Sequence, residues 1–278
     1  MAGAATLNET DSAPSFALVD RTPADVQAMM LSVLDRLADL RGIQRVREIG
    51  RAALDIRRGQ RLLDAGCGVG EEARVLARLA GPDGEVTAID LSTALVAAAA
   101  RRDRGSGVHY AVGDITALDF PDEAFDRVRS ERVLQHLAEP DLAVAELARV
   151  TAPGGRVCLI DTDWQSFLVE GMPEDIFREL QRLGRERGRG RPSGRLLRGQ
   201  LVRAGLTDVI AEPVPIPMTD RTTAETVHPF FNPSVLHRMG TVPKELSELW
   251  FSAFEAALAR DDFLAVLTIW VVTGVKAS

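Results

Sequence analysis

From Arg61 onward, short apolar segments alternate with segments of helical periodicity, and this alternation constrains the fold more than any other feature of the sequence. The strands are expected at 61–64, 85–90, 108–112, 125–130 and 156–161. The helices between them are expected at 72–79, 93–102 and 141–150. Alternation of this kind is typical of a parallel sheet covered by helices, with ligands at the carboxyl ends of the strands. The sequence therefore predicts an α/β fold.

Further elements flank this region. Two amphipathic helices, one starting near Ala24 and one over 46–54, are predicted to form a cap. A helix at 196–204 and a strand at 208–212 follow the alternating region, and a long strand over 263–275 is expected to close the sheet. The predicted organisation is a flexible N-terminus (1–20), a helical cap (21–57) and one large domain (58–278). Insertions near 164–195 and 214–260 would line a substrate pocket.

Size and charge exclude several functions. A chain of 278 residues, 46% of them hydrophobic, can bury the core of one enzyme-sized unit. Its net charge of -7 argues against a dedicated nucleic-acid binder and favours a small-molecule partner. The two cysteines have no disulfide or zinc spacing, and no metal-binding cluster is apparent in the sequence, so no required metal is expected. With no signal sequence or bilayer-length apolar run, we expect a cytoplasmic protein without membrane insertion, and a homo-oligomer is possible in principle.

The turn after the first strand, 64–70, has the sequence Asp-Ala-Gly-Cys-Gly-Val-Gly. Glycines at alternating positions let a ligand lie directly against main-chain N–H groups. A Gly-rich turn between a strand and a helix predicts a nucleotide-cofactor site, but it serves dinucleotide enzymes as well.

Acidic residues at two further strand ends narrow the choice of cofactor. Asp90 ends the second strand, where its carboxylate can accept hydrogen bonds from ribose hydroxyls. The third strand ends in Gly113-Asp114-Ile115, which places a second carboxylate and an apolar side chain where an adenine could bind. A carboxylate next to an apolar side chain at the end of the third strand is less usual in enzymes that use NAD.

Together with segments 63–70, 89–92, 133–137 and 153–155, these residues resemble the class I S-adenosylmethionine-dependent methyltransferases. The most similar branch is the small-molecule one, methyltransferase type 11, typified by ubiquinone and menaquinone C-methyltransferases. This resemblance implies a Rossmann-like, mostly parallel seven-stranded sheet with an antiparallel last strand and helices on both faces. It also implies S-adenosylmethionine as cofactor and S-adenosylhomocysteine as product.

Carried over by position, the resemblance assigns the cofactor site. Gly66 and Gly68 would approach the methionine and ribose parts, Asp90 the ribose, and Leu91 the adenine. Arg47, in the cap, is a candidate for the cofactor's carboxylate, and a solvated helix arginine is the alternative. The full set of expected cofactor residues is Arg47, Asp64, Ala65, Gly66, Cys67, Gly68, Asp90, Leu91, Gly113, Asp114, Ile115, Ser130 and Glu131.

Methyl transfer from a sulfonium is an in-line displacement, in which positioning outweighs general-base catalysis. If a base exists, His136 is the first candidate because it follows the fourth strand and histidine titrates near neutral pH. A structural role, in which it stabilises its loop, is the favoured alternative. Asp163 is a second candidate that could orient a hydroxyl or amine, with core packing or capping as its alternative.

The acceptor is predicted to be a small hydrophobic metabolite, typical of natural-product metabolism. The expected pocket residues are Met29, Gln135, Trp164, Phe230 and Phe231, with His228 and His237 as weaker candidates. The Arg-rich stretch 178–198 fits either a solvated linker or an electropositive lid. Alternatives are a quinone-biosynthesis C-methyltransferase, a methyltransferase fold with a non-methylating function and an NAD-dependent oxidoreductase.

Overall fold

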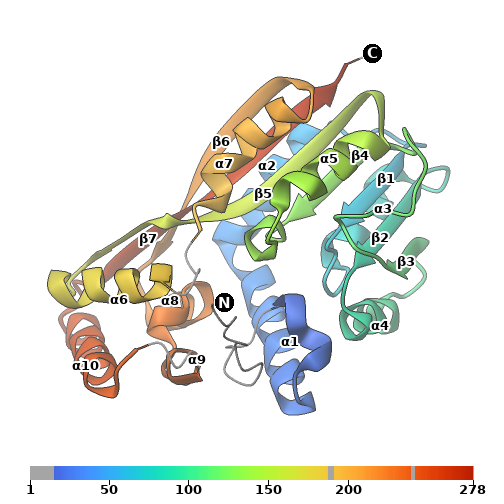
Figure 1. Cartoon of the computed structure of the whole chain (residues 1–278). Helices are drawn as coiled ribbons and strands as arrows, with labels where there is room; N and C mark the ends of the chain where they lie inside the picture. Colours follow the sequence, from blue (N-terminus) through green and yellow to red (C-terminus); the bar gives the residue numbers. More distant parts are fainter. Residues whose placement is uncertain (1–15, 187–190, 239–241, 278) are drawn as a thin grey trace, which may run out of the picture.

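The computed structural model describes residues 16–186, 191–238 and 242–277. Its centre is a seven-stranded sheet with the order β3-β2-β1-β4-β5-β7-β6, shown in Figure 1. All neighbouring strands from β3 to β5 are parallel, and β7 is antiparallel to both β5 and β6. The predicted α/β fold with a mostly parallel sheet and an antiparallel last strand is confirmed.

The first part of the sheet follows the predicted alternation. Strands β1 to β4 span Arg61–Ala65, Glu85–Asp90, Val108–Val112 and Phe125–Glu131. Helices α3 (Glu71–Ala80) and α4 (Thr93–Arg102) connect the first three strands, and α5 (Pro140–Val150) connects β4 to β5. The short 3-10 helix η2 (Leu134–His136) lies directly after β4. The carboxyl ends of β1, β2 and β4 therefore meet at one edge, as parallel strands require.

Two strands, β5 and β6, are much longer than the sequence predicts, whereas β7 keeps its predicted length. β5 spans Thr151–Glu170, β6 spans Leu206–Met218 and β7 spans Leu264–Lys276. The strand expected to close the sheet is not at its edge: β7 lies between β5 and β6, and most of its middle residues are buried. Because β7 hydrogen-bonds to a strand on each side, it keeps both neighbours extended well beyond their short apolar runs.

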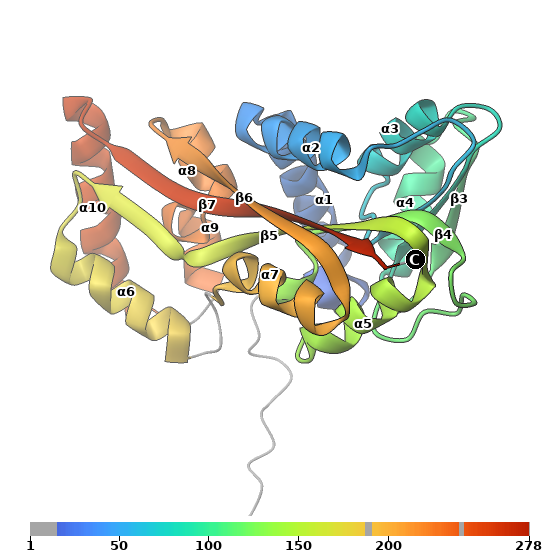
Figure 2. The ribbon, with the colours of Figure 1, turned by 90° about the horizontal axis from the view of Figure 1, so that it is seen from above.

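Helices cover both faces of the sheet and also its extension. Figure 2 shows α2 (Arg41–Leu54) and α3 on one face, and α5 and α7 (Ser193–Arg203) on the other. The far ends of β5, β6 and β7 carry α6 (Glu174–Glu186), α8 (Arg221–Val227), η3 (Pro229–Phe231), α9 (Pro233–Arg238) and α10 (Lys244–Arg260). Trp250, Phe254 and Phe263 are buried in the core of this extension.

The N-terminal segment is held against helix α4 where the structure describes it. η1 (Phe16–Arg21) and α1 (Ala24–Asp39) precede α2. Asp20 accepts hydrogen bonds from the backbone N–H groups of Thr93 (2.7 Å) and Ala94 (3.1 Å), which lie in the first turn of α4. These N–H groups have no partner inside their own helix. Residues 16–20 are therefore anchored, whereas the rest of the predicted flexible N-terminus, 1–15, lies outside the described residues.

Candidate cofactor and acceptor site

The glycine turn is held tightly between β2 and the segment after β4. The backbone N–H groups of Gly66 and Cys67 both donate to the carbonyl of Ile89, at 2.8 Å. Gly66 has a φ of 82°, a conformation that favours glycine. A Cβ atom at this position would lie 2.1 Å from Cγ2 of Val133. The loop can therefore follow its observed path only with glycine at position 66.

Asp90 connects this turn to the end of β2. One carboxylate oxygen accepts from the N–H of Gly68 at 2.9 Å, and the other accepts from the N–H of Ser92 at 3.0 Å. Burial raises the pKa of Asp90, and the hydrogen bonds from the two N–H groups oppose this shift. Each carboxylate oxygen has a second lone pair, so Asp90 can also accept hydrogen bonds from the ribose hydroxyls of a cofactor.

The end of β3 contributes a second group of cofactor candidates. Asp114 uses one carboxylate oxygen to accept from Thr116, through its N–H (2.8 Å) and its hydroxyl (2.7 Å). Leu91 keeps 53% of its surface exposed, whereas Ile115 is buried. An adenosine fits this arrangement, because an apolar side chain is open to its ring and carboxylates flank it.

A single cavity of about 940 Å³ joins these residues to an apolar region. Its cofactor side is lined by Gly66, Gly68, Asp90, Leu91, Gly113, Asp114, Ile115 and Glu131. Its other side is lined mainly by apolar residues of α1, β5, β7, α8 and η3, among them Met29, Met30, Val33, Trp164, Phe167, Val227, Phe230 and Ile269. Its volume lies near the upper end of the roughly 300–1,000 Å³ of typical ligand pockets, which leaves room for a second molecule.

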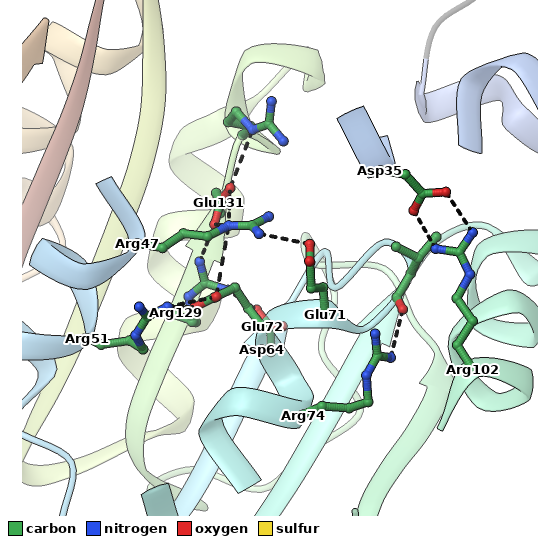
Figure 3. A network of polar contacts seen from close by, with 12 residues as sticks. Asp35, Arg47, Arg51, Asp64, Glu71, Glu72, Arg74, Arg102, Arg129 and Glu131 are labelled. Carbon is green, nitrogen blue, oxygen red and sulfur yellow. Dashed lines mark hydrogen bonds and ion pairs between the residues drawn. The ribbon is translucent and has the colours of Figure 1, made fainter. Parts of the chain in front are cut away.

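Five of the expected cofactor residues do not line the cavity: Arg47, Asp64, Ala65, Cys67 and Ser130. Figure 3 shows the ion-pair network that occupies two of them. Arg47 donates from Nε to Glu131 at 3.0 Å and from Nη1 to Glu71 at 2.9 Å. Arg129 contacts Asp64 at 2.9 Å and Glu131 at 2.5 Å. The guanidinium of Arg47 is thus paired with protein carboxylates, and its contact with the cofactor's carboxylate stays a prediction.

Burial and charge act in opposite directions in this network. Burial raises the pKa of Asp64 to about 6, although Arg129 favours the ionised form. Burial also acts to raise the pKa of Glu131, but Arg47 and Arg129 outweigh it and hold this pKa well below its usual range. The network connects α2, the start of α3, β1 and β4 directly behind the cofactor turn. The ion-pair network supports the glycine turn. Glu131 belongs to the network and also lines the cavity, so it can contact the cofactor.

The segment after β4 carries the polar residues between the two sides of the cavity. The N–H of Gln135 donates to Asp161 at 2.8 Å, and its side-chain oxygen accepts from Nε1 of Trp164 at 2.7 Å. Gln135, His136 and Trp164 all line the cavity, as expected. His136 is an exposed residue that lines the cavity, and desolvation by the surrounding atoms together with the charge of Arg132 lowers its pKa to about 4. Near neutral pH this imidazole is uncharged, and its role as a base stays a prediction.

Two predicted residues lie elsewhere. Asp163 does not line the cavity; its carboxylate accepts from Nη2 of Arg195 at 2.8 Å and from the N–H of Gln165. Side chains alternate along a strand, so Trp164 faces the cavity while Asp163 faces α7. Phe231 is fully buried against Trp250, whereas its neighbour Phe230 reaches the cavity. Both placements correct the sequence-based expectation.

The cavity also contains residues that the sequence did not single out as its lining. Among them are Thr162, Gln165, Phe167, Gln181, Arg185, Arg191 and Thr226. Alternation from Trp164 could have indicated Thr162, but the others depend on the extension of β5 and on helices packed far along the chain. His228, a weaker candidate, lines the cavity, whereas His237 is exposed and does not. Arg185 and Arg191 place part of the Arg-rich stretch at the cavity, and residues 187–190 lie outside the described part.

The sequence predicts no required metal and no membrane insertion, and the structure addresses these two expectations only within the residues that it describes. No cluster of three or more His, Cys, Asp or Glu side chains suited to a metal ion occurs in the part of the chain that the structure covers. Within the same residues, no helix combines the length and apolar character needed to cross a bilayer.

Comparisons with known proteins agree with this geometry. Residues 63–159 match the family described as "Methyltransferase domain". The chain is 32% identical to the ubiquinone/menaquinone biosynthesis C-methyltransferase UbiE of Erwinia tasmaniensis, over 58% of this chain and 68% of that protein. UbiE of Bordetella parapertussis is 34% identical, over 58% of this chain and 66% of that protein. An uncharacterized 37.1 kDa transposon protein of Streptomyces fradiae is 33% identical over 87% of this chain and 70% of that protein.

Solved structures share the fold at low sequence identity. A phosphoethanolamine N-methyltransferase of Haemonchus contortus, in complex with S-adenosylhomocysteine, has a TM-score of 0.60 and 22% identity, over 95% of this chain and 61% of that one. The [4+2]-cyclase SpnF has a TM-score of 0.57 and 20% identity, over 96% and 98%. The glycine turn, the acidic strand ends, the sheet order and these relatives lead to one conclusion. The chain belongs to the class I S-adenosylmethionine-dependent methyltransferases.

Proposed function

We propose that this enzyme methylates a C, O or N atom of a small, largely apolar organic molecule in natural-product metabolism. The observation that carries the proposal is the single cavity that runs from the glycine turn to the apolar residues of α1, β5 and η3. A cofactor against Gly66, Gly68 and Asp90 would share this cavity with an acceptor against Met29, Trp164 and Phe230. The insertions near 164–195 and 214–260 would supply most of the acceptor side.

The bound cofactor supplies a methyl group on a positively charged sulfur, and in-line attack by the acceptor consumes this charge. Holding two reactants in line accounts for roughly 7–11 kcal/mol of barrier reduction. A general base contributes about 10²–10⁴-fold, or roughly 3–5 kcal/mol. The cavity walls of Met29, Trp164 and Phe230 would hold the acceptor and exclude water. Positioning by these walls is the larger effect.

His136 would serve as a hydrogen-bonding group at the junction of the two sides. With its pKa near 4, the neutral imidazole can accept a proton but is a weak base at neutral pH. Gln135, fixed by Asp161 and Trp164, would contact the acceptor beside it. This arrangement suits an acceptor that is already nucleophilic, such as an enol, a phenol or an amine.

Two alternatives have a specific observation behind them. Identity of 32–34% to UbiE proteins favours C-methylation of a quinone precursor. The fold shared with the cyclase SpnF favours a non-methylating reaction in a cofactor-binding scaffold.

The test is a transfer experiment with S-adenosylmethionine that carries a deuterated methyl group. Purified protein is incubated with separate pools of phenols, naphthoquinols and amines, and the products are analysed by mass spectrometry. Label in a phenol, enol or amine pool supports the proposal, and label only in naphthoquinols supports the quinone alternative. Absence of label from every pool, in protein that binds S-adenosylhomocysteine, supports the non-methylating alternative. Asp90→Ala is the matched control and should abolish transfer.

A further inference from the structure

His228 stands out among the polar residues of the acceptor side because it is almost completely buried in an aromatic wall. Only 4% of its surface is exposed, yet it lines the cavity. Its ring stacks on Phe167 with centroids 4.0 Å apart and meets the edge of Trp164 at 5.4 Å and Phe230 at 4.7 Å. Burial lowers the pKa of this imidazole to about 3. The imidazole is therefore neutral.

The backbone determines where the proton of this neutral ring lies. His228 joins α8 to η3, and its Nδ1 accepts a hydrogen bond from the N–H of Phe230 at 3.2 Å. An imidazole nitrogen that accepts a hydrogen bond carries no proton, so the proton of the neutral ring is on Nε2. Nε2–H is thus a donor whose tautomer is fixed by the main chain.

This donor has no partner within the described residues. Nδ1 is the only ring nitrogen of His228 that forms a hydrogen bond, and Nε2 is not among the fully enclosed polar atoms that lack a partner. Nε2 therefore opens into the cavity that the residue lines. A buried donor without a partner is costly, whereas a ligand atom that accepts its hydrogen bond removes that cost.

The surroundings define the chemistry of that ligand atom. The aromatic rings of Trp164, Phe167 and Phe230 favour a planar, conjugated body. A neutral donor among them favours an uncharged oxygen acceptor and leaves an ammonium group or a hydrocarbon without a matching partner. Trp164 connects this wall to the segment after β4, because its Nε1 donates to Gln135 at 2.7 Å.

We propose that Nε2–H of His228 binds a carbonyl or phenolic oxygen of a planar acceptor substrate, and that this contact determines specificity. The inference rests on the proposed function, because it assigns the substrate class of the same cavity. His228 would be a positioning residue for the acceptor and would not contact the cofactor.

Two substitutions separate the roles of the ring nitrogens. His228→Asn offers an oxygen near the position of Nδ1, so the N–H of Phe230 keeps its partner, but no atom reaches the position of Nε2. His228→Gln is longer, and its amide N–H can reach that position.

Binding is measured by calorimetry with saturating S-adenosylhomocysteine present. The two probes are acetylnaphthalene and ethylnaphthalene, which has the same skeleton without the oxygen.

Wild-type protein should bind acetylnaphthalene at least about tenfold more tightly, as the loss of one buried hydrogen bond implies. His228→Asn should lose this preference and His228→Gln should keep most of it, with unchanged affinity for S-adenosylhomocysteine in both. Equal binding of the two probes by wild type, binding of neither, or an unchanged preference in His228→Asn overturns the inference. If wild type binds no S-adenosylhomocysteine, the proposed function itself fails.

A spectroscopic measurement needs no stable variant. The chain has 4 histidines, so their imidazole nitrogen resonances can be resolved by NMR in wild-type protein. His228 should show a protonated Nε2, an unprotonated Nδ1 and no titration between pH 5 and 8. A protonated Nδ1, or titration near pH 6.5, contradicts the assignment.

Discussion

Gly66→Ala is the substitution that most sharply tests how the cofactor turn is built. Gly66 and Gly59 both have a φ of 82°, so alanine experiences the same left-handed backbone strain at either position. At Gly59 an added Cβ would have no neighbour within 4 Å, whereas at Gly66 it would lie 2.1 Å from Cγ2 of Val133. Gly59→Ala is therefore a matched control that contains the strain without the collision.

The expected loss of stability combines the cost of the left-handed backbone with the cost of the collision with Val133. Left-handed backbone costs a non-glycine residue about 1–2 kcal/mol. Overpacking a tight site costs about 1–3 kcal/mol more. We expect Gly59→Ala to lose only the first amount and Gly66→Ala to lose roughly 2–5 kcal/mol. Movement of the turn away from Val133 would also disturb the hydrogen bond of 2.9 Å from Gly68 to Asp90, so affinity for S-adenosylhomocysteine should fall at least about tenfold.

Urea unfolding gives the free energy of unfolding, and calorimetric titration gives the affinity. Val133→Ala in the Gly66→Ala background removes the two closest methyl groups and should restore part of both quantities. If Gly66→Ala matches Gly59→Ala in stability and in affinity, the collision does not shape the turn. If Val133→Ala restores nothing, the contact between these residues is not the cause of the loss.

The remaining predictions concern charge, chemistry and packing. Glu131→Gln should lose about 3–5 kcal/mol at pH 7, because it removes the one carboxylate that Arg47 and Arg129 share and leaves each buried arginine with fewer ion pairs. The pKa of Glu131 is held low in the folded state, so the stability from its ionised form is fully present above the unfolded pKa of about 4.3 and is lost as the pH falls below it. The difference between wild type and Glu131→Gln in urea unfolding should thus shrink at acid pH, and a constant difference would contradict this. His136→Ala should lower kcat less than the roughly 10²–10⁴-fold expected for a lost base, and a larger fall would restore His136 as the base. Phe231→Ala should cost about 3–5 kcal/mol and leave acceptor KM almost unchanged, whereas a KM effect without loss of stability would return Phe231 to the pocket.

The order of elements could be predicted because each local signal agrees with the fold. The second strand, for example, was expected at 85–90 and is found at Glu85–Asp90. The long strands could not be delimited in this way. β5 continues to Glu170 only because β7, more than ninety residues later, hydrogen-bonds to it. Such pairing leaves little trace in the local pattern of β5 itself.

In the candidate site, too, some residues could be predicted from local motifs and others depend on long-range packing. The glycine turn, Asp90 and Asp114 could be found because local motifs carry them. Arg47 could not, since its partner Glu131 is 84 positions away and several strands and helices lie between them. A periodic pattern shows that Arg47 lies on a polar helix face, but not whether that face meets solvent, a cofactor or a carboxylate. Only the packing of α2 against the sheet answers this.

The central claim is that the turn and the acidic strand ends form an S-adenosylmethionine site. Calorimetric titration of the wild-type protein with S-adenosylhomocysteine and, separately, with NAD tests it directly. The account predicts saturable, 1:1 binding of S-adenosylhomocysteine that Asp90→Ala abolishes, and no response to NAD. Saturable binding of NAD together with no response to S-adenosylhomocysteine would contradict it.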